Sequence, residues 1–176
     1  MRLQLGVFGG HREESRTSLR AAKEFGELIA NRGHVLVTGG AAGVSKAAAE
    51  AALAANGIVL AFLPGTCESM LSEGLWVAPQ FITVWTGMGY RGRNLIAVRS
   101  CHAAFVVSGG IGTLTEVALA VAEGVPVCGL SGTAGVAERI EEVRTWFPQV
   151  GDDLFVEGRV QAAFERLCAR AIRRGA

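Results

Sequence analysis

Short apolar segments of this chain repeatedly end in a pair of glycines, and a helix-type pattern follows each pair. The pairs are Gly9-Gly10, Gly39-Gly40 and Gly109-Gly110. The segments before them are continuously apolar rather than alternating, which is typical of strands buried on both faces. Such strands, alternating with helices, require a parallel sheet covered on both sides. We therefore expect an α/β fold, a doubly wound Rossmann-like parallel sheet with helices on both faces.

The same pattern continues along the chain without a linker or repeat, so residues 1–176 are predicted to form a single Rossmann-like domain. Half of the residues are apolar, which suffices to bury such a sheet. The expected strands are Leu3–Phe8, His34–Thr38, Ile58–Leu63, Phe81–Trp85, Ala103–Val107 and Pro126–Leu130. The expected helices are Thr17–Arg32, Gly43–Ala55, Gly92–Ser100, Gly112–Glu123 and Arg159–Arg173. Thr66–Gln80 is predicted to be a surface loop, and residues 131–157 give no clear pattern.

Charge and composition limit the partners of the chain. The net charge is +1, so bulk electrostatics favour neither nucleic acid nor a membrane surface. No apolar stretch approaches the roughly 18 residues of a membrane-spanning helix, and Met1–Phe8 is too short for a signal peptide. The four cysteines form no Cys-x-x-Cys pair, and we expect reduced thiols in a cytoplasmic protein.

The glycine pairs point to one ligand site. Because the carboxyl ends of parallel strands meet at one edge, the three turns share the edge where doubly wound folds bind ligands. Glycine there permits positive φ and close approach of the backbone to a ligand. The alternative is that tight strand-to-helix turns need glycine for their own geometry. Three pairs at one edge favour a ligand, and Gly9, Gly10, Gly39 and Gly40 are predicted to contact it.

The segment 108–116 carries the strongest signal. Its glycines lead directly into a helix, whose free N–H groups and dipole favour an anion such as phosphate. The predicted phosphate-binding residues are Ser108, Gly109, Gly110, Gly112 and Thr113.

Two charged residues are placed to reach the same ligand. Glu116 lies one turn inside the phosphate-binding helix, where it must face ribose hydroxyls or a cation, unless it is simply a solvated helix residue. Arg93 follows Arg91 at the start of the preceding helix. Its planar guanidinium suits phosphate, so we favour a functional role for it.

The sequence lacks the motifs of several well-known enzyme classes. The first turn lacks the Gly-x-Gly-x-x-Gly fingerprint of dinucleotide enzymes, and no Gly-Lys-Ser/Thr of a P-loop occurs. No Gly-x-Ser-x-Gly nucleophile elbow is present. His34 and His102 start strands at the opposite edge, so only His11 is placed to reach a ligand. We predict no metal site.

The residues 108–116, Ser-Gly-Gly-Ile-Gly-Thr-Leu-Thr-Glu, resemble the Pro-Gly-Gly-x-Gly-Thr-x-x-Glu signature of the Lonely Guy, or lysine decarboxylase-like, Rossmann superfamily. Known members release a cytokinin base from its riboside 5′-monophosphate. The resemblance implies catalytic roles for Arg93 and Glu116, which fall at the arginine and glutamate positions of that family. It also places Gly43 in the family's second glycine turn.

The Arg93-Asn94 pair is more similar to the branch of molybdenum-cofactor carrier proteins, which are thought to bind the phosphorylated cofactor without turnover. Asn94 therefore joins the predicted ligand-binding residues. Two functions stay open: hydrolysis of a purine nucleoside 5′-monophosphate to base and ribose 5-phosphate, or non-catalytic carriage of molybdenum cofactor or a related phosphorylated pterin. Neither requires a resident cofactor. The resemblance further implies a homodimer or higher oligomer.

Overall fold

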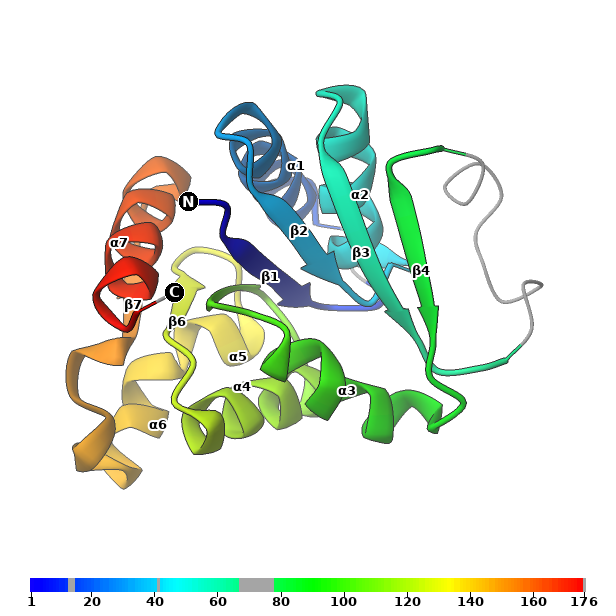
Figure 1. Cartoon of the computed structure of the whole chain (residues 1–176). Coiled ribbons are helices and arrows are strands. Elements are labelled where there is room, and N and C mark those ends of the chain that lie inside the picture. The colour runs from blue at the N-terminus through cyan, green and yellow to red at the C-terminus, as the bar shows by residue number, and fades with distance from the viewer. Residues whose placement is uncertain (13–14, 41, 67–77, 176) are drawn as a thin grey trace.

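The computed structural model describes residues 1–12, 15–40, 42–66 and 78–175. Its centre is a sheet of seven parallel strands in the order β4-β3-β2-β1-β5-β6-β7 (Figure 1). The predicted parallel sheet is thus confirmed, and the bounds of the six expected strands differ from the prediction by at most one residue. The strands are β1 (Gln4–Gly9), β2 (Val35–Thr38), β3 (Ile58–Leu63), β4 (Phe81–Trp85), β5 (Ala103–Val107), β6 (Val127–Leu130) and β7 (Leu154–Glu157).

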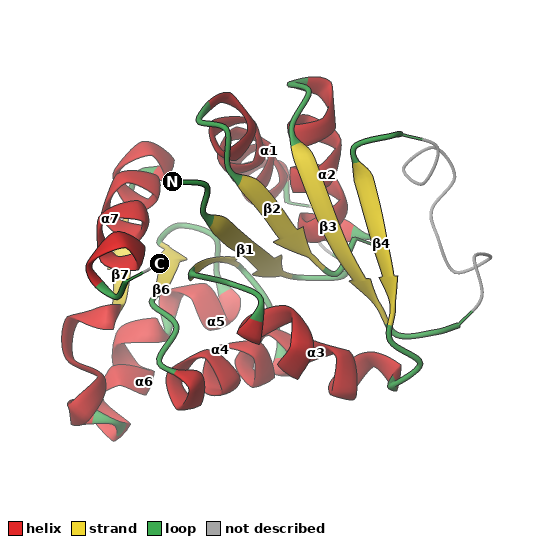
Figure 2. Ribbon diagram, viewed as in Figure 1, coloured by secondary structure: helices red, strands yellow, loops and turns green. Residues whose placement is uncertain are grey.

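Helices cover both faces of the sheet (Figure 2). One face carries α1 (Arg16–Asn31), α2 (Gly43–Ala54) and α7 (Val160–Arg173). The other carries α3 (Gly89–Arg99), α4 (Ile111–Glu123) and the short helices α5 (Gly135–Glu138) and α6 (Ile140–Trp146). Phe25 of α1 stacks on Phe105 of β5 at 4.0 Å between ring centroids. Such contacts between helix and strand fill the two apolar layers of the core.

The helix α3 begins at Gly89, three residues before the predicted start at Gly92. The extra turn is held by the chain after β3. The backbone N–H of Gly89 donates to the carbonyl of Pro64 at 3.0 Å, and that of Thr86 donates to Leu63 at 3.1 Å. These non-local bonds stabilise a glycine-rich start that local propensity disfavours.

Residues 131–157, which gave no clear pattern, contain α5, α6, a short 3-10 helix (Pro148–Asp153) and β7. β7 pairs with β6 and so extends the sheet. Two N–H groups of α5 brace the turn after β5: Val136 donates to Gly109 at 3.0 Å and Ala137 donates to Ser108 at 3.1 Å. Most of the predicted loop Thr66–Gln80 lies outside the described residues.

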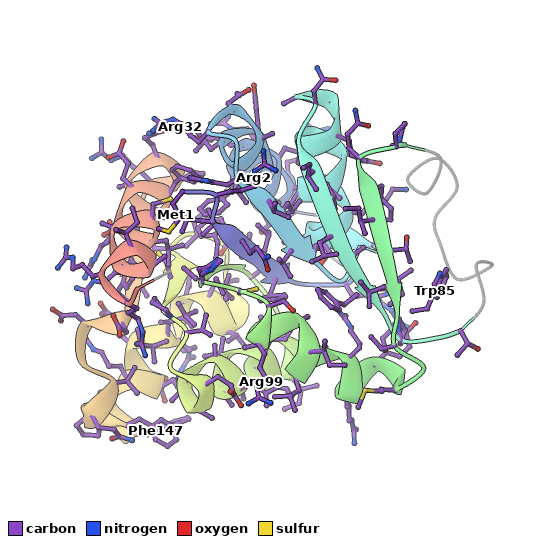
Figure 3. All side chains as sticks on the ribbon, viewed as in Figure 1. Met1, Arg2, Arg32, Trp85, Arg99 and Phe147 are labelled. Carbon is purple, nitrogen blue, oxygen red and sulfur yellow. The ribbon has the colours of Figure 1, made fainter. Side chains whose placement is uncertain are left out.

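The edge opposite the glycine turns has a structural role. His102 Nδ1 accepts the backbone N–H of Gln4 at 2.8 Å, and His34 Nδ1 accepts that of Leu3 at 3.3 Å. Arg99, labelled in Figure 3 at the end of α3, pairs with Glu123 of α4 at 2.9 Å between Nε and Oε2. This ion pair joins the two helices that carry Arg93 and Glu116.

Cys101, Cys128 and Cys168 are free thiols, whereas Cys67 lies outside the described residues. None of the described helices is both long and apolar enough to cross a membrane.

Candidate functional site

A cleft of about 780 Å³ opens at the carboxyl edge of the sheet. It lies where β1 and β5 are neighbours and where the chain connections leave in opposite directions, the usual position of a ligand in a doubly wound fold. Its volume suits a small organic ligand. The lining residues are Gly9, Gly10, His11, Arg12, Tyr90, Arg91, Arg93, Asn94, Gly110, Ile111, Gly112, Thr113, Thr115 and Glu116. A recess that shares part of this wall also contacts Gly39, Ala42, Ser45 and Pro64.

The amino end of α4 forms one wall of the cleft. Gly110 caps the helix without a side-chain hydrogen bond, and the first intrahelical bond runs from the N–H of Leu114 to Gly110 at 2.9 Å. The N–H groups before Leu114 therefore have no partner within the helix. Gly109 has φ +101°, and a Cβ there would overlap the Thr113 side chain. Glycine is thus required where the chain turns into α4.

The helix α3 forms the facing wall. Tyr90, Arg93 and Asn94 follow the i, i+3, i+4 spacing and so share one helix face. Asn94 is only 5% exposed, yet its Oδ1 has no hydrogen-bond partner among the described residues. The same holds for Nε and Nη1 of Arg93. The Arg93 guanidinium lies against Gly39, where a Cβ would overlap it. The turn after β2 therefore fixes the position of this cation.

Glu116 is buried in the cleft at 7% exposure. Burial raises the pKa of its carboxyl to about 7, although the nearby Arg93 guanidinium opposes the shift. Burial likewise lowers the pKa of Arg93, against the effect of Glu116. Among the described residues, the two opposite charges form no ion pair within 4.0 Å. They border the same recess, so polar groups of a ligand can be placed between them.

Four predicted site residues lie beside the cleft wall rather than in it. Gly40 has φ +68° and packs toward Ala61. Gly43, at φ +56°, lies tightly against the carbonyls of the turn after β1. Ser108 is buried, and its N–H donates to Thr133 Oγ1 at 3.0 Å. The carbonyl of Gly109 accepts the N–H of Val136 in α5. These residues shape the turns, and their contact with a ligand stays a prediction.

The other predicted residues come together in the cleft and its recess, namely Gly9, Gly10, Gly39, Arg93, Asn94, Gly110, Gly112, Thr113 and Glu116. The cleft is also lined by Arg12, Tyr90, Ile111 and Thr115, which were not predicted from the sequence. Tyr90 could have been found only with the correct start of α3, because its spacing to Arg93 is then helical. Within the described residues, no group of three or more His, Cys, Asp or Glu could hold a metal.

The model of the SLOG cluster4 family matches residues 2–152, so the chain belongs to this family. This membership confirms the resemblance to the Lonely Guy superfamily that segment 108–116 indicated. An uncharacterized protein of Archaeoglobus fulgidus is 39% identical over 131 residues, which cover 73% of this chain and 80% of that protein.

Two solved structures share the whole architecture. The molybdenum cofactor binding protein from Rippkaea orientalis superposes with a TM-score of 0.81 at 28% identity, covering 96% of this chain and 97% of that chain. The molybdenum cofactor carrier protein from Chlamydomonas reinhardtii has a TM-score of 0.77 at 31% identity, covering 96% and 99%. The expected similarity to the carrier branch is thereby confirmed.

Proposed function

We propose that the cleft binds a phosphorylated pterin of the molybdenum-cofactor type and carries it as cargo without turnover. The observation that carries this proposal is the set of buried polar atoms that have no partner among the described residues, Oδ1 of Asn94 and Nε and Nη1 of Arg93. A buried polar group left unpaired costs about 1–3 kcal/mol. A ligand that supplies the missing partners recovers this free energy on binding.

The anionic end of the ligand is assigned to the amino end of α4. Hydrogen bonds from N–H groups to a charged oxygen contribute about 1.5–3 kcal/mol each. The N–H groups near Gly112 and Thr113 can supply several of them, and Arg93 adds a cation. The similarity to a cofactor binding protein and a cofactor carrier supports a pterin as the remaining part of the ligand.

A second candidate is hydrolysis of a purine nucleoside 5′-monophosphate. It is favoured by the position of Glu116, three residues after Thr113 on the same helix. At 1.5 Å per residue, the Cα of Glu116 lies about 4.5 Å along the helix axis from that of Thr113. That spacing suits ribose hydroxyls, where an ionised carboxylate would stabilise an oxocarbenium-like transition state.

Purification from cells that synthesise molybdenum cofactor tests the first proposal. We expect a pterin to accompany the protein, measured by fluorescence after oxidation. Gly112→Ala should lower the pterin content about tenfold, because Gly112 lines the cleft and a Cβ there meets no described protein atom within 4 Å. The matched control is Gly158→Ala, whose Cβ lies at an ordinary 3.6 Å from Ser131 Oγ and outside this cleft.

Incubation with AMP separates the two candidates. Release of adenine that Glu116→Gln abolishes would establish the hydrolase instead of the carrier. Pterin binding without base release supports the carrier. If calorimetry detected no binding of pterin phosphate, AMP or inorganic phosphate, both proposals would be refuted.

A further inference from the structure

The exposed part of the cleft carries Tyr90 and Ile111 beside the polar His11, Arg12 and Arg91, and its base is polar. Tyr90 is 57% exposed and Ile111 is 81% exposed, and both line the cleft. Asn94, Thr113 and Glu116 line the same cleft but are buried. A ligand with an anionic group at one end and a ring at the other can contact both the buried polar base and the exposed Tyr90 and Ile111.

The two apolar side chains hold fixed positions relative to the polar base. Tyr90 lies one helical turn before Arg93 and Asn94 on the same face of α3. Ile111 begins α4 and directly precedes Gly112 and Thr113. Ile111 therefore adjoins the anion-binding N–H groups, and Tyr90 lies one helical turn, about 5 Å, along α3 from Arg93. A ring joined to a phosphate by a short linker spans this distance.

We infer that Tyr90, together with Ile111, forms a binding surface for the planar heteroaromatic ring of the phosphorylated ligand. The site then selects ring-bearing phosphate esters over sugar phosphates and inorganic phosphate. This inference rests on the proposed function, because it assigns the second part of the same ligand. Tyrosine suits the role: its ring stacks offset on another aromatic ring, and its hydroxyl stays in water.

A second copy of the chain is the competing occupant, since exposed apolar side chains also occur at subunit interfaces. The polar base of the same cleft favours the ligand, because Tyr90 lines this cleft together with Arg93 and Asn94, whose polar atoms lack partners among the described residues. Ring stacking is worth up to about tenfold in affinity. Tyr90→Ala should therefore weaken a ring-bearing ligand by about that factor, whereas Tyr90→Phe should retain the affinity.

The chain has one tyrosine, so ring-¹³C labelling of tyrosine yields a single NMR reporter at the proposed surface. The ring-bearing probes are AMP and 6-hydroxymethylpterin phosphate, and the ring-free probes are ribose 5-phosphate and inorganic phosphate. We expect an upfield ring-current shift with the ring-bearing probes only. By calorimetry, Tyr90→Ala should leave the affinity for ribose 5-phosphate unchanged. Circular dichroism checks that this exposed-site variant is folded.

Three results would overturn the inference. The first is tight binding of AMP or the pterin phosphate with an unshifted Tyr90 resonance, which leaves the proposed function standing. The second is an equal loss of affinity for ribose 5-phosphate in Tyr90→Ala. The third is a shift of the resonance on dilution of the ligand-free protein, which assigns the surface to a second copy. Absence of any anion binding would refute the proposed function itself, and this inference with it.

Discussion

Replacement of Asn94 by alanine should make the ligand-free protein more stable. Asn94 is 5% exposed and its Oδ1 is unpaired among the described residues. Removing an unsatisfied buried polar group recovers part of a penalty of about 1–3 kcal/mol. Alanine also favours the helix by up to about 0.7 kcal/mol. Lost packing offsets some of this gain, because the truncated side chain borders an open cleft.

The net expectation is a rise of about 1 kcal/mol in the free energy of unfolding, or about 2–4 °C in Tm for a chain of this length. Urea titration and calorimetry of the ligand-free protein measure both quantities. In the same variant, the affinity for 6-hydroxymethylpterin phosphate should fall about five- to tenfold, because one hydrogen bond to the ligand is lost. Stability and binding therefore change in opposite directions.

Ser18→Ala is the matched control for this experiment. Ser18 is fully buried on α1, and its Oγ has no partner among the described residues, but it does not line the cleft. Its replacement should raise stability without changing ligand affinity. A loss of 1 kcal/mol or more in ligand-free Asn94→Ala would refute the reasoning, because it would mean that the amide stabilises the fold rather than binding a ligand.

Three further variants test the site. Burial raises the pKa of Glu116 to about 7 from its ordinary 4.5, so the folded chain keeps a proton that the unfolded chain loses. Stability should therefore fall by on the order of 2 kcal/mol as pH rises from 4.5 to 7, and urea unfolding of Glu116→Gln should lack this slope. Gly39→Ala should displace the Arg93 guanidinium and weaken phosphate binding about tenfold by calorimetry, and unchanged binding would exclude Arg93 from the anion site. Gly112→Ala should raise Tm slightly through its helix propensity while reducing bound pterin, and a fall in Tm would contradict an open environment at this position.

Much of the fold could be predicted because its signals are local. Continuous apolar runs such as Ala103–Val107 identify buried strands, and glycine turns mark their ends. The start of α3 could not be found this way, because Gly89 depends on a bond to Pro64 from another part of the chain. β7 was missed for a related reason: its four residues are stabilised by pairing with β6, which no local pattern indicates.

The candidate site, too, could be predicted only in part from the sequence. The sequence by itself determined that three glycine turns meet at one edge of a parallel sheet and that Arg93 and Glu116 lie near it, because strand direction and helix spacing follow from local pattern. Only the tertiary structure decided that Glu116 is buried and that Oδ1 of Asn94 has no partner among the described residues. It also decided that the Arg93 guanidinium lies against Gly39. These properties arise from how α3 and α4 pack across the cleft, and desolvation and missing partners exist only once that packing has formed.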